Sequence, residues 1–248
     1  MFRIWRGAWL TLVIRKSDMR IGILQPGYLP WLGFFEQLYR SDVFVIYDDV
    51  QYDRDGWRNR NRIKTANGMQ WLTVPVHSKF EEHLLINNVR IDNKVNWGKK
   101  HLLSLKTNYS KSPFFLKYMD IFEEAYSRTW EYLIDVSMYF ILELSRCLGL
   151  NEKKILKSST LNIAGDSIER LLKICKRFDA DIFYEGAAGR NYIDENFFAR
   201  EGIAIEYQDY NHPVYRQLYG DFMPYMSVVD LLFNYGDESL AILLNKNL

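Results

Sequence analysis

Continuous apolar runs and amphipathic stretches alternate along this chain. Residues 20–24 and 42–47 are apolar without polar alternation, which is typical of strands in a parallel sheet that is covered on both faces. Residues 32–40, between them, have apolar positions at helical spacing. A strand, a helix and a strand in this order predict a parallel crossover unit.

The alternation continues to the end of the chain. Residues 70–76 predict a third strand, and residues 84–91 predict a fourth that is antiparallel or peripheral. A long helical region follows at about 97–150, broken near residues 110–113, with 126–148 as one core helix. Further strands are predicted at 155–158, 181–184 and 203–207, and further helices at 166–177, 197–200 and 228–233.

No linker rich in proline, glycine or serine, and no internal repeat, divides residues 19–248. We therefore predict one α/β domain with a mostly parallel, Rossmann-like sheet flanked by helices and a helical insertion in the middle. Residues 1–18 are predicted to be an N-terminal extension outside the fold, because their apolar run is short and flanked by cations. The sequence contains no run of 18 apolar residues, so no integral membrane segment is predicted.

Charge and composition narrow the class of function. The 248 residues carry 32 Lys and Arg against 31 Asp and Glu, so nothing demands a polyanionic partner and DNA is not an expected one. Cys147 and Cys175 lie in apolar helical stretches and are predicted to be reduced core thiols, as in a cytoplasmic protein. The histidines and cysteines have no metal-ligand spacing, so no metal is predicted. The 17 tyrosines and 7 tryptophans supply flat, hydrogen-bonding surfaces of the kind that hold sugars and bases, although part of them must form the core.

The first candidate site follows the first strand. Residues 25–35 combine two prolines, two glycines and four aromatic residues ahead of the predicted helix. Open parallel sheets bind ligands at the carboxyl ends of their strands, so Gln25 and Tyr28 are predicted to contact a ligand. The alternative is a tight connection in which Gly27 relieves steric crowding and Pro30 starts the helix.

Two adjacent carboxylates, Asp48 and Asp49, follow the second strand. Such groups act as a base, bind a metal or accept from ribose hydroxyls, and the alternative is a turn in which they bond their own backbone. Neighbouring side chains in an extended chain point apart, so only one is expected to face the pocket. The sequence does not rank them.

A basic segment then interleaves an aromatic ring, amides and cations. Arginine forks match phosphate oxygens and a tryptophan offers a stacking face, so the segment is predicted to be an anion-binding loop, with a solvated basic loop as the alternative. RNA contact is also conceivable, but weakly supported in a chain of near-neutral charge. The predicted binding residues are Trp57, Arg58, Asn59, Arg60, Asn61, Arg62 and Lys64.

His212, after the last strand, is the best candidate for a general base, because its ordinary pKa lies near neutrality. The alternative is a packed or solvated histidine. His77, at the end of the third strand, is a second candidate, and Tyr215 belongs to the motif around His212.

A glycine-bearing turn follows the strand at 181–184. Gly186 and Gly189 would let the backbone approach a ligand, with Arg190 beside it, although such a turn is a weak signal by itself. No phosphate-binding P-loop, no Gly-x-Ser-x-Gly elbow and no Cys–His pair is present, so NTPase and covalent hydrolase functions are excluded.

Several of these motifs, in this order, resemble the WbqC-like protein family: residues 25–35, 48–52, 57–64, 71–76, 186–192, 212–215 and 227–236. The resemblance runs from about Met19 to the C-terminus. It implies work on surface polysaccharide, O-antigen among them, and in the sharpest form N-acylation of a nucleotide-linked amino sugar with glycine or a similar aminoacyl group. It does not supply a list of catalytic residues.

A second resemblance bears on the mechanism. Residues 27–35 are similar in position, and in Pro30 and Gly33, to the phosphate-binding loop of nucleotidylyltransferases and class I aminoacyl-tRNA synthetases, whose fold is called HUP-like. Trp31 and Phe34 stand where that loop has its two histidines. The helix N-terminus can still favour a diphosphate without them.

The resulting hypothesis is an acyl or aminoacyl transferase acting on a nucleotide-linked amino sugar. The arginines would hold the diphosphate, Trp57 and Tyr28 the rings, Asp48 or Asp49 the hydroxyls, and His212 would take the proton. No cofactor is identified, and the acyl donor stays open between aminoacyl-tRNA and acyl-CoA. The alternatives are a nucleotidyltransferase with a degenerate phosphate motif and a non-catalytic protein that binds nucleotide sugars or glycans.

Overall fold

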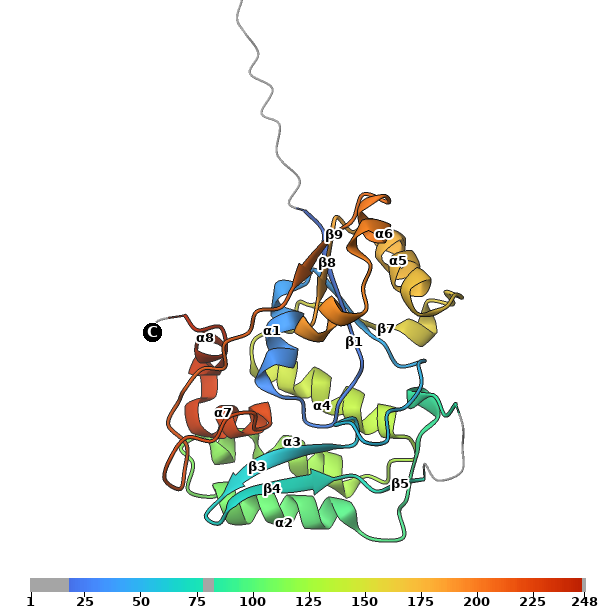
Figure 1. Ribbon diagram of the computed structural model, residues 1–248. Coiled ribbons are helices and arrows are strands. Elements are labelled where there is room, and N and C mark those ends of the chain that lie inside the picture. The colour runs from blue at the N-terminus through green and yellow to red at the C-terminus, as the bar shows by residue number, and fades with distance from the viewer. Residues whose placement is uncertain (1–17, 78–82, 247–248) are drawn as a thin grey trace, which may run out of the picture.

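A five-stranded, all-parallel sheet forms the centre of the computed structural model, which describes residues 18–77 and 83–246. Its order is β7-β2-β1-β8-β9, as the upper half of Figure 1 shows. The predicted α/β, Rossmann-like class is confirmed. The predicted extension, apart from Asp18, lies outside the described residues. The strands are β1 (Arg20–Leu24), β2 (Val43–Ile46), β7 (Lys154–Lys157), β8 (Ile182–Glu185) and β9 (Ala204–Tyr207).

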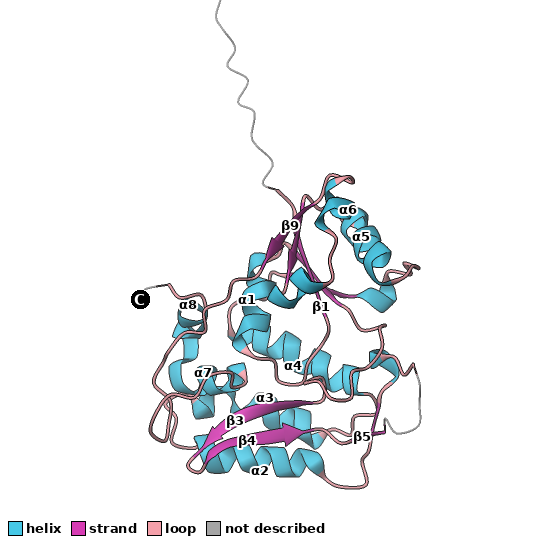
Figure 2. Ribbon diagram, viewed as in Figure 1, coloured by secondary structure: helices cyan, strands magenta, loops and turns pink. Residues whose placement is uncertain are grey.

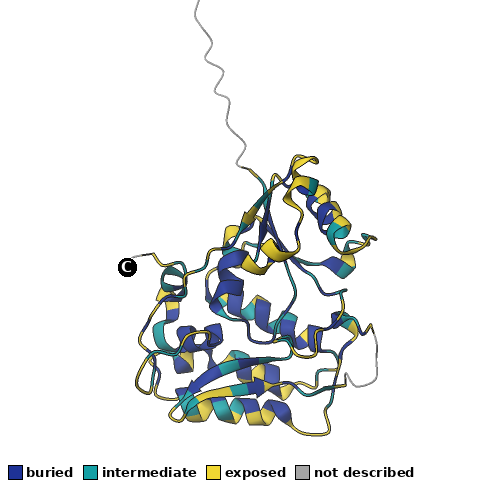
Figure 3. Ribbon diagram, in the orientation of Figure 1, coloured by how far each residue is buried: buried dark blue, intermediate teal, exposed yellow. Residues whose placement is uncertain are grey.

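The two faces of the sheet bury different side chains. Phe44 and Ile46 of β2 pack with α1 (Leu32–Arg40) and α4 (Leu133–Cys147), whereas Val43 and Val45 pack with α5 (Ser167–Arg177) and α6 (Glu195–Ala199). Successive side chains of a strand point to opposite faces, so a strand covered on both sides needs apolar residues throughout. Figure 2 shows helices on both sides of the strands, and Figure 3 shows the buried interior between them.

An insertion between β2 and β7 forms the lower half of the molecule in Figure 1. Its helical part was predicted, and the core helix expected at 126–148 is confirmed as α4, although α3 ends at Ser127 and α4 begins only at Leu133. The elements, with those that close the chain, are β3 (Arg60–Thr65), β4 (Gly68–Thr73), β5 (Val76–His77), η1 (Ile86–Asn88), β6 (Arg90–Ile91), α2 (Trp97–Tyr109), α3 (Phe115–Ser127), η2 (Ser158–Thr160), η3 (Ala187–Asn191), α7 (Val228–Tyr235), η4 (Gly236–Glu238) and α8 (Ser239–Leu243).

The structure corrects two further expectations about the insertion. The strand predicted at 70–76 does not join the parallel sheet, because β4 pairs antiparallel with β3, Arg62 opposite Trp71. The basic segment expected to be a loop supplies that partner strand. Its charged side chains are therefore held in register.

The described helices include none that is long and apolar enough to cross a membrane. Cys147 and Cys175 are both free thiols, and Cys175 is fully buried as predicted. Cys147 is partly exposed.

Candidate active site at the carboxyl edge of the sheet

A pocket of about 630 Å³ opens at the carboxyl ends of β1, β2 and β8. The chain leaves β1 towards β2 on one side and later enters β8 on the other side, so the connections diverge at this point. Such a topological switch point leaves a crevice in which open α/β sheets bind their ligands. The N-terminus of α5, with Gly165, Asp166 and Ser167, forms another wall.

Glu185, the last residue of β8, is the most perturbed acid of the pocket. It is only 6% exposed, and the Tyr192 hydroxyl donates to its Oε1 at 3.2 Å. Burial disfavours the charged carboxylate and raises the pKa of Glu185 to about 7. A carboxyl group with this pKa can take or give a proton near neutral pH, which is what general acid–base catalysis requires.

Asp49 reaches the pocket from the end of β2. It forms an ion pair with Arg170 of α5 and accepts a hydrogen bond from the Ser158 hydroxyl. The Arg170 guanidinium lies 5.1 Å from the centre of the Tyr47 ring, and its Nε donates to the Ile163 carbonyl at 2.9 Å. These contacts tie the ends of β2 and α5 together on one wall.

Asp48 points elsewhere and is fully buried. Its carboxylate accepts from the Ser159 backbone N–H at 2.9 Å and from the Ser159 hydroxyl at 2.7 Å, and so holds the η2 turn. Only one of the two carboxylates therefore faces the pocket, and the structure selects Asp49. Asp48 is placed where it stabilises the turn after β7, not where it could act on a ligand.

Arg58 and Gln25 complete the pocket lining near β1. Burial lowers the pKa of the Arg58 guanidinium, and its Nε has no hydrogen-bond partner among the described residues. A half-buried cation in the same pocket as the positive end of the α5 dipole favours an anion. Diphosphate oxygens have the matching charge and acceptors.

Tyr28 does not line the pocket. It is fully buried, and its hydroxyl shares hydrogen bonds with His101 Nδ1 at 2.8 Å and with the Tyr126 hydroxyl. Burial lowers the pKa of His101 to about 4. The prediction that the Tyr28 ring contacts a ligand is wrong, because the residue belongs to the core beneath α2 and α3.

Both ring nitrogens of His212 are also used in hydrogen bonds within the fold. Its Nδ1–H donates to the Pro213 carbonyl at 2.9 Å, and its Nε2 accepts from the Tyr225 backbone N–H at 3.2 Å. No lone pair is left to take a proton, and burial lowers the pKa of the ring. Tyr215 is buried against it, 6.4 Å between ring centres. Neither residue lines the pocket, so the role of His212 as base finds no support in its geometry.

Three predicted members of the anion-binding segment hold backbone instead. Lys64 is buried and donates to the Asp221 and Gly220 carbonyls. Asn61 donates to the Leu29 carbonyl at 2.7 Å, and Asn59 to the Val74 carbonyl at 2.8 Å. These side chains fasten β3 to its neighbours.

The remaining members of that segment lie outside the pocket. Trp57, Arg60 and Arg62 are on the outward face of the β3–β4 hairpin. His77, on β5, is exposed and lies 3.9 Å from the Asp92 carboxylate. Of the predicted basic segment, the structure brings only Arg58 into the pocket.

Of the predicted residues in the glycine-bearing turn, only one lines the pocket. Gly186 lines the pocket, and a side chain built there would meet nothing within 4 Å. Gly189 packs under Glu185, where an added Cβ would lie 2.3 Å from the Glu185 Cγ. Arg190 lies over the Tyr207 ring at 4.4 Å, outside the pocket.

Sequence reasoning missed Glu185, Arg170, Tyr47 and Tyr192 as pocket residues. Glu185 carried a usable signal, since it is an acid at the carboxyl end of a buried strand. Arg170 carried none, because it is one of several cations on an amphipathic helix. Among the described residues, no group of three or more His, Cys, Asp and Glu side chains could hold a metal ion.

Comparison with known proteins identifies relatives of the chain. The model of the WbqC-like protein family matches residues 25–242. The uncharacterized protein Rv1507c of Mycobacterium tuberculosis is 36% identical over 222 residues, which cover 89% of this chain and 95% of that protein. No solved structure is significantly similar to the chain. The chain belongs to the WbqC-like protein family.

Proposed function

We propose that the protein is a cytoplasmic transferase that N-acylates the amine of a nucleotide-linked amino sugar during the synthesis of surface-polysaccharide precursors. Membership in the WbqC-like family suggests a role in polysaccharide-related biosynthesis. The finer assignment rests on one observation: a buried carboxyl group with a pKa of about 7 lies in the same pocket as the half-buried cation Arg58.

The reaction needs a proton acceptor near neutral pH. As the sugar amine attacks the acyl carbon, a C–N bond forms and the bond from that carbon to the donor's oxygen or sulfur breaks. Glu185 takes the proton that the amine loses, and the donor leaves with the electron pair and is protonated in turn. A sugar amine is protonated in part at pH 7, so a base of matched pKa is suited to it.

The binding roles follow from position in the pocket. Arg58 and the N-terminus of α5 hold the diphosphate, since both favour negative charge. Asp49, fixed by Arg170, accepts from hydroxyls of the sugar or ribose. Gly186 lets the substrate approach the backbone, where a side chain would stand in the way.

The test compares the wild type with Arg58→Ala and Glu185→Gln, and uses Arg190→Ala as a matched cation control outside the pocket. Calorimetric titration with dTDP-, UDP- and GDP-linked amino sugars should show that the wild type binds one of them strongly. Arg58→Ala should bind that sugar at least tenfold more weakly, and Arg190→Ala should bind it with unchanged affinity. Glu185→Gln should bind it normally. Absence of binding to every nucleotide sugar would contradict the proposal.

Catalysis is read separately, by mass spectrometry of the sugar after incubation with acyl donors. Aminoacyl-tRNA and acyl-CoA are supplied in parallel, because the donor class is open. Glu185→Gln should lower kcat about 100-fold, and wild-type kcat/KM should rise with pH through about 7, where Glu185 loses its proton. Pyrophosphate release from an added NTP would favour the nucleotidyltransferase alternative, and sugar binding without any product would favour the non-catalytic one.

A further inference from the structure

A second surface outside the pocket combines tryptophans and arginines in alternation. On the outward face of the β3–β4 hairpin the Arg62 guanidinium lies 4.4 Å from the Trp57 ring centre and 5.5 Å from that of Trp71. The Arg60 guanidinium lies 5.0 Å from the Trp71 ring. The two rings are 4.8 Å apart, edge to face. We call Trp57, Arg60, Arg62 and Trp71 the Arg–Trp ladder.

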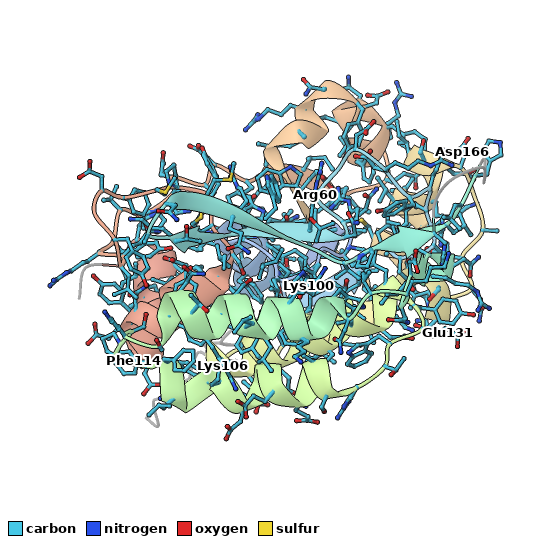
Figure 4. The ribbon with its side chains drawn as sticks, turned by 90° about the horizontal axis from the view of Figure 1, so that it is seen from below. Arg60, Lys100, Lys106, Phe114, Glu131 and Asp166 are labelled. Atoms are coloured by element: carbon cyan, nitrogen blue, oxygen red, sulfur yellow. The ribbon has the colours of Figure 1, made fainter. Side chains whose placement is uncertain are left out.

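The strand geometry explains why these residues share one face. Arg60 and Arg62 are two positions apart on β3, so their side chains point the same way, and Trp71 is the cross-strand partner of Arg62. The alternate residues, Asn61 and Ile63, point inward and are buried. In Figure 4, Arg60 lies on the side of the hairpin away from α2, which carries Lys100. Nothing in the proposed acyl transfer uses this face.

The ladder has an exposed ring and, in the part of the chain that the structure describes, two positive charges without ion pairs, which are available to a ligand. Trp57 is 39% exposed, whereas a tryptophan that serves only packing is usually more deeply buried. Arg60 donates to the Asp55 carbonyl at 2.8 Å and Arg62 to the Tyr225 carbonyl at 3.0 Å, and neither forms an ion pair within the described residues. The Nε atoms of both are buried, so what these arginines offer a ligand is their positive charge. Two cations without a carboxylate partner among the described residues favour a polyanion.

The ladder also adjoins the pocket. Arg58, which lines the pocket, follows Trp57 directly, and its carbonyl accepts from the Tyr28 backbone N–H at 3.0 Å. On the other side the ladder continues through Tyr225, which is 51% exposed and whose ring lies 6.1 Å from that of Trp31. The surface thus runs from the candidate active site to Tyr225.

We propose that the Arg–Trp ladder binds single-stranded RNA, with bases stacked on Trp57 and Trp71 and phosphates held by Arg60 and Arg62. Aromatic platforms bordered by cations are the general means of binding unpaired strands, because every base has a flat face and every linkage a charge. The choice of RNA rests on the proposed acyl transfer: an acyl group esterified to a terminal ribose would be carried along the ladder into the pocket.

Binding is measured by fluorescence anisotropy of a labelled single-stranded oligoadenylate RNA at several salt concentrations. Trp71→Ala and Trp57→Ala should each weaken binding by at least tenfold. Arg60→Gln and Arg62→Gln should weaken it and reduce the slope of log affinity against log salt by about one each. Lys100→Ala, an exposed cation on the opposite side of the hairpin, is the matched control and should leave affinity unchanged.

Several outcomes would overturn the proposal: no binding of the oligonucleotide, equal binding by the ladder variants, equally tight binding of duplex RNA, or equal affinity for polyglutamate, which would identify a site for acidic proteins. Thermal unfolding checks that each variant is folded, and the arginine variants carry the test if Trp71→Ala is not. Glu185→Gln should bind RNA normally, and ladder variants should bind nucleotide sugar normally. Failure of the RNA site and failure of the proposed function are therefore distinguishable.

Discussion

Carboxyl groups in this protein acquire different roles from their surroundings. Asp48 accepts from the η2 hydroxyl and backbone donors, Asp49 is paired with Arg170, and Glu185 has the Tyr192 hydroxyl and the Gly186 backbone as donors. Burial disfavours the charged form of a carboxyl group, and hydrogen bonds offset that effect in part. At Glu185 the two donors do not make up for burial, and this deficit raises its pKa to about 7.

That deficit predicts a pH-dependent stability. The pKa of Glu185 is raised from 4.5 to about 7, so between these pH values the folded protein holds a proton that the unfolded chain releases. The free energy of unfolding therefore falls as pH rises through this window, by up to about 3 kcal/mol from this residue. Glu185→Gln lacks the group, so relative to wild type it should be more stable at pH 8 than at pH 5.

Urea denaturation of both proteins at pH 5 and pH 8 measures this difference. Taking the difference between variant and wild type removes the contributions of all other titrating groups. A difference that does not change between the two pH values would show that Glu185 ionises as freely in the folded protein as in the unfolded one.

At the scale of elements, the turn after β8 is built to place Glu185. Gly189, in η3, comes so close beneath this side chain that an added Cβ would lie 2.3 Å from its Cγ, and 3.2 Å from atoms of Ile193 and Tyr207. Gly186, three residues earlier in the same turn, has open space. Neither glycine has a positive φ, so space and not backbone conformation distinguishes them.

Gly189→Ala should therefore destabilise the protein by about 1–3 kcal/mol, because the methyl group overpacks the turn. It should also lower kcat, since Glu185 is displaced. Gly186→Ala is the matched control for stability and should unfold at nearly the wild-type urea concentration. Equal midpoints for the two variants would mean that the turn relaxes freely around Gly189.

The hairpin β3–β4 is the element that sequence patterns described least well. Its first strand reads Arg-Asn-Arg-Ile-Lys-Thr, and five polar residues with only one large apolar side chain suggested a loop. Pairing with β4, the Tyr109 hydroxyl bond to the Lys64 N–H and the burial of Asn61 and Lys64 impose the strand. β4 follows β3 directly, but Tyr109 and the carbonyls that hold Asn61 and Lys64 come from distant parts of the chain, so no local pattern indicates them.

At the scale of the whole molecule, the two proposed sites lie on different parts of the structure, the sheet edge and the insertion. Hydrogen–deuterium exchange should separate them. A bound nucleotide sugar should protect the ends of β1, β2 and β8 and the first turn of α5, whereas bound RNA should protect residues 60–73. Protection of a single shared region by both ligands would contradict the division, and a sugar without a nucleotide serves as the control.

Much of the fold could be predicted from the sequence, because a strand that is buried on both faces has a continuous run of apolar residues. The apolar runs of β1 and β2, with α1 between them, were predicted at or near their observed bounds. The helix predicted at 228–233 is α7, and the Ser227 side chain before it accepts a hydrogen bond from the Val229 N–H. A pocket at the strand ends also agrees with the sequence pattern, since parallel strands present their carboxyl ends at one edge.

The residues that line the pocket could not be predicted from such patterns. Tyr28 and His212 looked free in the chain, but donors and acceptors from other elements use up their polar atoms. Glu185 and Arg170 looked unremarkable, and they meet the predicted Arg58 only because the sheet brings β8, α5 and the segment before β3 to one pocket. Hydrophobic periodicity is a property of neighbours along the chain, whereas burial, pKa and pairing are properties of neighbours in space.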